Sequence, residues 1–508
     1  MKTIAGLILF SLFLIRAEAS IINAASVSQA DVSAAINSAA NGDTVVIPAG
    51  TSTWTTGISV SGKAIKIQGA GSGRIIGRTL TSTTVGTGSK TFTTQSGLSI
   101  TTGQTLRVVR RADGSTFSKV DTRSTYMEGT VTGYSGTTLV LNVTSTSGSG
   151  TYATWFIATN PLTTINFTGT SGQGFSLTAP SSGNIELSGI KLTSNHPNPA
   201  YGIRIFNGLS TTLIHDCWFS ALVGGAQLIS SATNTAVVWN CSFDAPFFQT
   251  ELGIQFKWED ATGAQSWTTS DTIGMHDTNG NKNFYVEDCD FHYFLNAMDT
   301  DGNSRVVVRH CTFDNAGTGS HGADTGPYGT RHWEYYNNTH IFEPTTNGVV
   351  LPLNWWIFIR GGTGVITDNV MPKITSQDYP NKGSVTMIVE NIRRNAGPYP
   401  CWTTYPAPHS AGRGNNGTSN TMLVGDFTDP IRVWNNTGGT DASNVGIIQY
   451  EPDECGNGTL ATAFTKINRD YFFSTDSTAA RSGYQKYTYP HPLRGSLPPA
   501  PQNLHTLP

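Results

Sequence analysis

Apolar and polar positions follow one recurring frame through the middle of the chain. The frame joins apolar residues, a polar residue, a cysteine and a phenylalanine, as in IHDCWF, VWNCSF, VEDCDF and VRHCTF. The cysteines of these copies are separated by 24, 48 and 22 residues. We interpret the 48 as two periods with one divergent repeat between. In LSGIKL, YYNNTH and ITDNVM the cysteine slot holds Ile190, Asn338 and Asn369. A fixed period of this size predicts a stacked array.

Each repeat is rich in Val, Ile, Phe and Thr, which indicates strands. Val308 and Cys311 are three residues apart, so strict alternation would place them on opposite faces, and a bend between them is needed for both to point inward. The residue before the cysteine slot is in turn Asp216, Asn240, Asp288, His310, Asn337 and Asp368. Asn, Asp and His tolerate a left-handed backbone best among non-glycine residues. This turn ladder predicts an all-β, right-handed parallel β-helix with coils about 4.8 Å apart.

The N-terminal region predicts a cap on this stack. Asp31–Ala40 reads as a short amphipathic helix that ends at Asn41-Gly42, and GDTVVIP follows as the first strand. The stretch resembles the N-terminal cap and first coil of the pectate-lyase-like superfamily. Later phrases, DTDGNSRVVVRHCTF, HGADTGPYGTRHWEYYNN and YTYPHPL, resemble secreted bacterial β-helix proteins, many without an assigned reaction. The resemblance therefore implies a fold more than an activity.

Composition and charge narrow the class of protein. The 508 residues are too many for one ordinary compact core, and only 13% are charged, against about 25% in typical domains. The net charge of -3, without a basic stripe, argues against a nucleic-acid partner. Lys2, the apolar run Ile4–Ile15 and the A-x-A pattern ending at Ala19 predict an export signal cleaved near Ala19. That run is too short to span a bilayer, so we expect an extracellular protein with no membrane span.

The expected domain organisation has five parts: a signal peptide (1–19), the cap and first coil (20–80), an inserted module (81–158), the coils with the expected active groove (159–445) and a C-terminal extension (446–508). The insertion alternates apolar and polar residues between glycine turns, which predicts a small antiparallel β structure. It resembles a module of phage tail and virion surface proteins, which implies contact with a glycan or cell surface. A rigid spacer without a ligand is the alternative.

Titratable residues gather in two neighbouring repeats. In pectate-lyase-like proteins the loop after the third strand lines the substrate cleft, so the resemblance implies a catalytic groove here. We expect it to hold Asp299, Asp301, His321, Asp324 and Arg331. In glycoside hydrolysis the aspartates would act as acid and base or nucleophile, with His321 moving protons. In β-elimination His321 would be the base and Arg331 or Ca²⁺ the neutralising charge. No cofactor is certain, and DTDGN is an incomplete calcium loop.

Further residues are candidates for substrate binding or for disulfides. Aromatic rings stack on sugars, although packing explains many of them equally well. The substrate-binding candidates are Trp267, Trp333, Glu334, Trp355 and Trp356. Stacked slots lie within disulfide range and export permits oxidation, so ladder disulfides are one alternative for the repeat cysteines. The disulfide candidates are Cys217 with Cys241, Cys289 with Cys311, and Cys401 with Cys455.

The function that follows is a secreted, carbohydrate-active protein that cleaves a polysaccharide, by hydrolysis or by elimination, in a groove beside the coils. Its expected partner is a polysaccharide or a cell-surface glycan. A non-catalytic glycan-binding or adhesion protein is the alternative. A virion-derived structural spike is a third hypothesis, against which the export signal argues.

Overall fold

The fold is described for a computed structural model of the chain. The described residues are 19–110, 125–169, 173–178, 180, 182–194, 201–208, 211–220, 224–230, 235–245, 251–258, 283–294, 296–301, 304–320, 330, 332–342, 345–346, 349–350, 353, 355–359, 362–372, 374, 387–389, 413–414, 427–428, 430–438, 447–448 and 467–495. The signal peptide predicted from the sequence lies outside them, except for Ala19.

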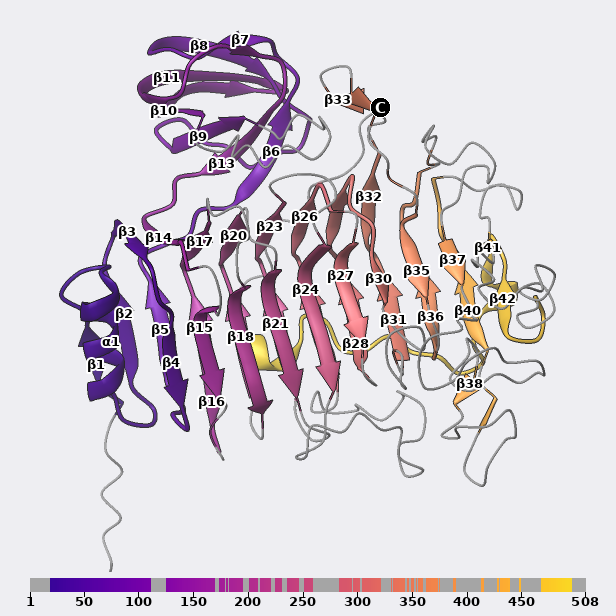
Figure 1. Ribbon diagram of the computed structural model, residues 1–508. Helices are drawn as coiled ribbons and strands as arrows, with labels where there is room; N and C mark the ends of the chain where they lie inside the picture. Colours follow the sequence, from indigo (N-terminus) through magenta and orange to yellow (C-terminus); the bar gives the residue numbers. More distant parts are fainter. Residues whose placement is uncertain are drawn as a thin grey trace, which may run out of the picture.

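Three long parallel sheets run side by side along the molecule (Figure 1). Sheet A has the order β1 (Ile21–Asn23), β2 (Thr44–Ile47), β5 (Lys66–Gly69), β16 (Asn184–Ser188), β19 (Thr211–His215), β22 (Ala236–Trp239), β25 (Phe284–Glu287), β28 (Arg305–Arg309), β31 (His332–Tyr336), β36 (Thr363–Thr367), β40 (Ile431–Trp434) and β42 (Tyr471–Phe473). Sheet B has the order β3 (Gly50–Trp54), β14 (Thr163–Phe167), β17 (Lys191–Thr193), β20 (Trp218–Ser220), β23 (Ser242–Asp244), β26 (Asp290–His292), β29 (Thr312–Asp314) and β32 (Thr339–Ile341).

Sheet C has the order β4 (Ile58–Ser61), β15 (Gln173–Thr178), β18 (Tyr201–Gly208), β21 (Gly224–Ser230), β24 (Glu251–Trp258), β27 (Asn296–Asp301) and β30 (Gly319–Ser320). Beyond β30 follow the parallel strands β35 (Ile357–Ile359), β37 (Met387–Val389) and β41 (Ile447–Ile448). The remaining small elements are β33 (Thr345–Thr346) with β34 (Val349–Val350), β38 (Arg413–Gly414) with β39 (Phe427–Thr428), and the 3₁₀ helices η2 (Ser477–Ala479) and η3 (Pro492–Arg494).

Successive coils stack in register, which confirms the predicted right-handed parallel β-helix. Val238 pairs with Val286, and Val286 pairs with Val308 one coil later. The phenylalanine of the repeat points inward and stacks on its equivalent in the next coil. The ring centroids of Phe291 and Phe313, for example, are 4.9 Å apart and nearly parallel. This column lies in one continuous apolar core, which no single coil could bury alone.

The predicted turn ladder is confirmed by the backbone. Its six residues all adopt the left-handed conformation, with φ between 50° and 58°. Asn435 continues the ladder with a φ of 53°, and Gly189 takes the same place in the LSGIKL repeat with a φ of 69°. The bend between Val308 and Cys311 lets both side chains lie in the core, as the three-residue spacing requires.

The interpretation of the 48-residue spacing was wrong. β22 pairs directly with β25, so Cys241 and Cys289 belong to adjacent coils with no repeat between them. The coil also contains β23 and β24. Its extra length falls between β24 and β25, where residues 259–282 lie outside the described part of the chain. A loop between strands can lengthen without changing the stack, so the period in the sequence is not strict.

The cysteine column, made of Cys217, Cys241, Cys289 and Cys311, holds free and buried thiols, so the predicted ladder disulfides are wrong. Each sulfur lies 3.3 Å from the carbonyl oxygen two residues earlier in its own coil. All four side chains therefore point the same way. Parallel side chains on in-register strands cannot reach the S–S distance and the roughly 90° dihedral angle of a disulfide. Cys401 and Cys455 lie outside the described residues.

Asparagine replaces cysteine in the same slot of the later coils. The Asn338 backbone N–H donates to Asn369 Oδ1 at 2.9 Å, and the Asn369 N–H donates to Asn436 Oδ1 at 3.0 Å. The side-chain amides also donate to one another and to inward-facing carbonyl groups. This asparagine column satisfies polar groups that the core would otherwise leave unpaired.

The predicted cap is confirmed as α1 (Gln29–Ser38), which covers the N-terminal end of the stack (Figure 1). Ser28 is the N-cap and its hydroxyl accepts the N–H of Asp31. Val32 and Ile36 are buried against the first coil, as the sequence pattern predicts. Lys63 Nζ donates to three carbonyl groups in the last turn, which favours that end of the helix. The described residues contain no helix long and apolar enough to cross a membrane.

The insertion forms an antiparallel sheet with its own core, as predicted. Sheet D has the order β6 (Ile75–Thr79), β13 (Trp155–Thr159), β9 (Thr105–Arg110), β10 (Tyr126–Ser135), β11 (Thr138–Ser147) and β8 (Gly88–Thr93), with β7 (Thr83–Thr84) and β12 (Thr151–Tyr152) beside it. Phe92, Met127 and Trp155 are fully buried in its core. This module begins with β6, earlier than residue 81, and stands over the coils near their N-terminal end (Figure 1).

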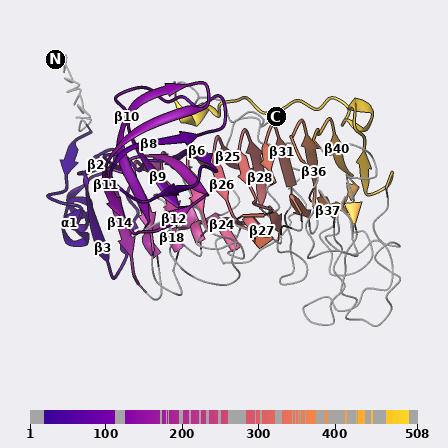
Figure 2. The same cartoon turned by 90° about the horizontal axis from the view of Figure 1, so that it is seen from above.

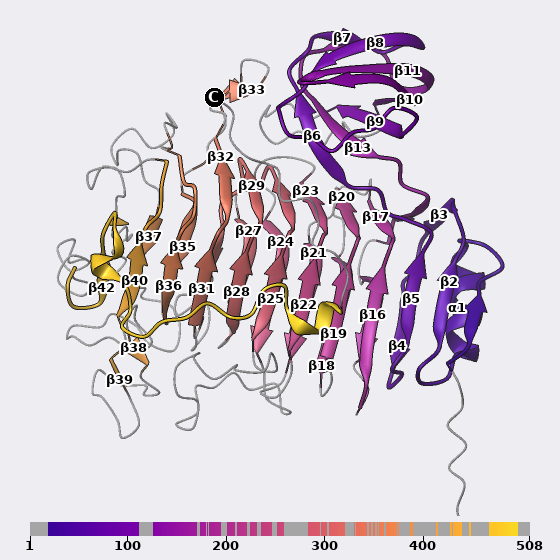
Figure 3. The ribbon, with the colours of Figure 1, turned by 180° about the vertical axis from the view of Figure 1, so that it is seen from behind.

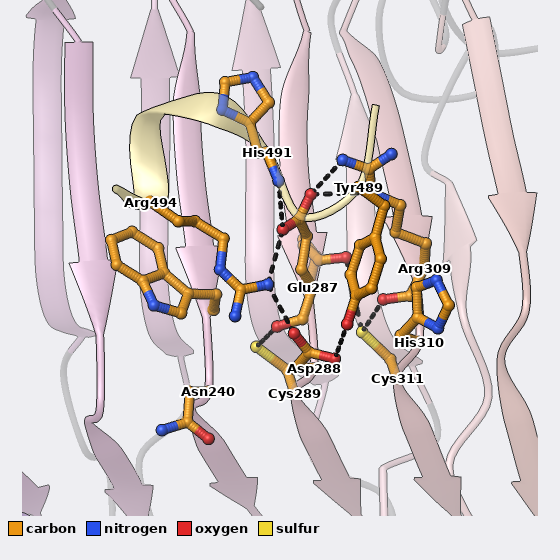
Figure 4. Close-up of polar contacts among 12 residues, drawn as sticks. Asn240, Glu287, Asp288, Cys289, Arg309, His310, Cys311, Tyr489, His491 and Arg494 are labelled. Atoms are coloured by element: carbon orange, nitrogen blue, oxygen red, sulfur yellow. Dashed lines mark hydrogen bonds and ion pairs between the residues drawn. The ribbon is translucent and has the colours of Figure 1, made fainter. Parts of the chain in front are cut away.

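The C-terminal strap, residues 474–495, runs back along the outer face of sheet A (Figures 2 and 3). Figure 4 shows how it is held: Arg494 lies between Glu287 and Asp288, and Tyr489 donates to Asp288. Glu287 also pairs with Arg309, and both side chains are fully buried. The strap therefore covers sheet A over β25, β28 and β31.

Candidate functional site

The predicted groove residues lie partly on sheet C. Asp299 on β27 is in register with Gln255 on β24, whose Nε2 donates to Asp299 Oδ2 at 2.7 Å. Both side chains are buried. Asp301 ends the same strand and is in register with Lys257. His321, Asp324 and Arg331 lie outside the described residues, so their convergence with Asp299 stays a prediction.

The predicted substrate-binding residues are spread over different parts of the fold. Trp333 and Trp356 are fully buried in the core, so neither offers a ring face to a sugar. Trp355 is half-buried against Phe358, with ring centroids 4.9 Å apart. Glu334 lies on the outer face of sheet A, where it accepts from His332 and from Tyr484 of the strap. Trp267 lies outside the described residues.

A second row of titratable residues lies on the outer face of sheet B. Its strands are three residues long and place their middle phenylalanine in the core, so the first and third residues point outward. The outward residues of neighbouring coils that can titrate are Asp244, Asp290, His292 and Asp314. All four are nonetheless buried, and residues of the inserted module contact Asp290, His292 and Asp314.

Two arginines of the module bind carboxylates of this row. Arg74 Nη2 lies 2.9 Å from Asp290 Oδ2, and Arg78 Nη1 lies 3.1 Å from Asp314 Oδ1. Arg74 also donates to Asn240 of the turn ladder. Each aspartate therefore faces one arginine of the module.

Apolar and ring contacts complete the closure. The Phe156 ring of β13 lies against the His292 ring, with centroids 4.7 Å apart. The Ile75 N–H donates to Ser242 Oγ at 3.2 Å. These contacts leave a closed cleft between module and coils, bounded by Asp290, His292 and Asp314 on the coil side. Its cavity of about 20 Å³ has room for about one water molecule.

The hydrogen bonds define the tautomer of His292. His292 Nδ1 lies 3.4 Å from Asp314 Oδ2, and because a carboxylate only accepts, Nδ1 carries the proton. Nε2 is then an acceptor. Nε2 is buried and has no hydrogen-bond partner among the described residues, and His292 is one of the residues that line the cavity. A buried imidazole nitrogen without a partner is costly in a folded protein, and a small polar molecule such as water would satisfy it.

The two aspartates differ in environment and are well separated. Burial raises the pKa of Asp290 above its usual value, although Arg74 and His292 act in the opposite direction. Asp290 and Asp314 are one coil apart across the sheet and two residues apart along the strand. Sheet geometry makes this offset about 4.8 Å by about 6.6 Å, so the Cα atoms of the two aspartates are roughly 8 Å apart.

Sequence reasoning missed these residues, although a signal was present. Asp290 and His292 flank the phenylalanine in CDFH, and Asp314 follows it in CTFD. Alternation about that phenylalanine places all three outside the core in adjacent coils. What the sequence does not show is the module folding over them. Among the described residues no three His, Cys, Asp or Glu side chains gather as a metal site, so the expectation of Ca²⁺ remains untested.

Comparisons with known proteins give structural neighbours alone. No family model matches the chain, and no curated protein does. The tailspike gp49 of Pseudomonas phage LKA1 has a TM-score of 0.15 and 14% identity, over 72% of this chain and 67% of that one. The tailspike Gp54 of Acinetobacter baumannii phage AP22, in complex with capsular saccharide, has a TM-score of 0.15 and 12% identity, over 78% of this chain and 64% of that one. The family 28 exopolygalacturonase of Yersinia enterocolitica has a TM-score of 0.22 and 10% identity, over 74% of this chain and 72% of that one. Likenesses of this degree carry no inference about activity.

Proposed function

We propose that the protein is a secreted enzyme that hydrolyses a polysaccharide at the closed cleft between the module and sheet B. One observation carries the proposal: Asp290, His292 and Asp314 line a water-sized cavity, and Nε2 of His292 is buried without a hydrogen-bond partner among the described residues. Hydrolysis needs a water molecule, a base for that water and an acid for the leaving oxygen, and these residues supply the acid and the base.

Each residue has one role in the reaction. His292 Nε2 accepts a proton from the attacking water, and Asp314 orients the ring through Nδ1 and stabilises the imidazolium that forms. Asp290, whose pKa is raised by burial, donates its proton to the glycosidic oxygen as the bond to the sugar carbon breaks. Attack from the face opposite the leaving group inverts the configuration of that carbon.

Hydrolysis fits this cleft better than β-elimination. Elimination requires a cation to neutralise the carboxylate of a uronate as its neighbouring proton is removed. The two guanidinium groups at the cleft already donate to aspartates, so a uronate carboxylate would first have to displace one of these side chains. Hydrolysis of a glycoside needs no such cation.

The cleft must open for a sugar to reach the acid and base. Its cavity admits a molecule the size of water, whereas a sugar ring is several times larger. The Arg74–Asp290 and Arg78–Asp314 pairs hold the module against sheet B. We propose that the substrate enters when the module moves away from the coils and exposes the row.

The test is a screen of polysaccharides against the full chain, with product reducing ends and absorbance of unsaturated sugars both recorded. We expect reducing ends without unsaturated products, and a rate at least about 10²-fold lower in Asp290→Asn and in His292→Gln. Glu128→Gln is the matched control, because it breaks a comparable Arg107–Glu128 pair at 2.7 Å elsewhere in the module. Equal rates in all three variants would refute the assignment, and unsaturated products would establish elimination instead.

Non-catalytic glycan binding is the second candidate function. It is favoured by the closure of the row, in which Asp290, His292 and Asp314 are 3%, 6% and 2% exposed. Under this alternative the arginine–aspartate pairs only dock the module. Polysaccharides that bind the chain without giving either product would support it.

A further inference from the structure

A second pocket opens on the surface of the module next to the closed cleft. Its volume is about 430 Å³, within the range of small-molecule sites. Arg78 and Gln95 border both this pocket and the closed cleft, so the two are contiguous. The rest of the lining is formed by Thr79, Leu80, Thr81, Thr93 and Thr94. We call it the threonine pocket.

Internal hydrogen bonds orient the hydroxyl groups of this pocket. Thr79 Oγ1 donates to the carbonyl oxygen of Thr93 at 2.6 Å, and Thr94 Oγ1 donates to that of Gln95 at 2.9 Å. Thr81 Oγ1 accepts the backbone N–H of Thr93 at 2.8 Å. Thr79 and Thr94 are buried, and Thr79 Oγ1 also accepts the Thr81 N–H at 3.1 Å, so their hydroxyls hold the lining together. Thr93 is exposed in the same lining, so its hydroxyl can both donate to and accept from a ligand. A sugar hydroxyl, which also donates and accepts, matches it.

The pocket also has an apolar surface and little free charge. Leu80 is a large apolar side chain that remains 59% exposed at the rim. Such a surface suits the C–H face of a sugar ring. The guanidinium of Arg78 already binds Asp314, and no other charged residue lines the pocket. A carboxylate or sulfate group would therefore find no uncompensated positive charge in the lining.

We propose that the threonine pocket is a binding subsite for a neutral, hydroxyl-rich sugar residue of the glycan chain. The subsite holds the chain on the module, beside the route into the closed cleft. This inference rests on the proposed function in one respect, namely that the ligand is a glycan. Its chemistry makes a separate commitment: neutral hexose chains bind here, and polyuronates do not.

The test measures binding without turnover in the full chain carrying Asp290→Asn. The probes are neutral hexaoses of glucose, mannose and galactose, and hexagalacturonate, titrated by calorimetry. We expect at least one neutral hexaose to bind and hexagalacturonate not to. Adding Thr93→Val should weaken binding about three- to tenfold, the range for one neutral hydrogen bond, and Thr93→Ser should restore it. Thr91→Val is the matched control, because Thr91 is exposed two residues earlier on β8, outside the pocket lining.

The outcomes separate this inference from the proposed function. Binding of hexagalacturonate alone, binding of none of the probes, or equal affinities in Thr93→Val and Thr91→Val would overturn the subsite. Hydrolysis by the wild type with an unchanged affinity in Thr93→Val would overturn the subsite and leave the enzyme proposal standing. If binding depends on Thr93 but the wild type cleaves no polymer, the enzyme proposal is overturned and the subsite stands.

Discussion

Replacing Glu287 by glutamine should release the C-terminal strap from sheet A. The Glu287 carboxylate is fully buried, pairs with Arg309, accepts from Arg494 at 2.8 Å and accepts the His491 N–H at 3.2 Å. Glutamine has nearly the same shape but carries no charge, and its amide group turns a donor toward the guanidinium donors. Removing one partner of a buried ion pair costs about 3–5 kcal/mol, because the remaining charge is buried without compensation.

The expected effect is local, so the assay is hydrogen exchange of strap peptides covering 484–495. A loss of about 3–5 kcal/mol, at about 1.4 kcal/mol per factor of ten, speeds exchange by roughly 10²- to 4 × 10³-fold. The control Glu128→Gln breaks the half-exposed pair with Arg107, which is worth about 1 kcal/mol or less, and leaves strap exchange unchanged. Exchange in Glu287→Gln within threefold of the wild type would refute the reasoning.

The same residue predicts a pH dependence of the strap. Burial raises the pKa of Glu287, but Arg309 and Arg494 outweigh it and lower the pKa below the usual 4.5. A lowered carboxyl pKa gives stability that is present above 4.5 and lost as the pH falls through the folded-state value. Strap exchange, corrected for its intrinsic rate, should therefore rise below pH 4.5 in the wild type and show no such rise in Glu287→Gln.

Three further predictions concern the coils. Burial lowers the pKa of His215, but hydrogen bonds to Asp216 and Glu186 outweigh it and raise the pKa to about 9. The protonated ring therefore contributes stability that is fully present below about pH 6.5 and is lost as the pH rises through about 9. His215→Gln should flatten the fall of the thermal midpoint over that range, and an unchanged slope would contradict it. Asn369→Leu should lower the free energy of unfolding by about 3 kcal/mol, because it leaves backbone groups of Asn338 and Tyr335 unpaired. Denaturant unfolding measures this, and an unchanged free energy would contradict the prediction. Alkylation without reductant should label the cysteine column only after denaturation; a need for reductant would contradict free thiols.

The repeat could be predicted from the sequence because its causes are local. A left-handed bend needs a residue that tolerates it, and this requirement recurs at the same place in every coil, from Asp216 to Asp368. The cap was readable for the same reason: a capping serine and a periodic apolar face specify α1 without help from the rest of the chain. The spacing of 48 misled because loop length leaves the stacking of strands unaffected.

The candidate site could not be predicted from the sequence in this way. In the sequence Asp290, His292 and Asp314 are ordinary outward residues of short strands, and nothing near them shows that they are buried. Arg74 reaches Asp290 across 216 residues of sequence, and Arg494 reaches Glu287 across 207. Such contacts depend on how folded units dock, and no local pattern records them.

The sequence by itself determined the period of the coils, the place of the bend, the inward column and the cap, because each follows from the preferences of a few neighbouring residues. Only the tertiary structure decided which outer faces are covered: sheet A by the strap and part of sheet B by the module. Burial of a charge depends on everything that surrounds it, and here it placed an outward-facing row of aspartate and histidine under the module.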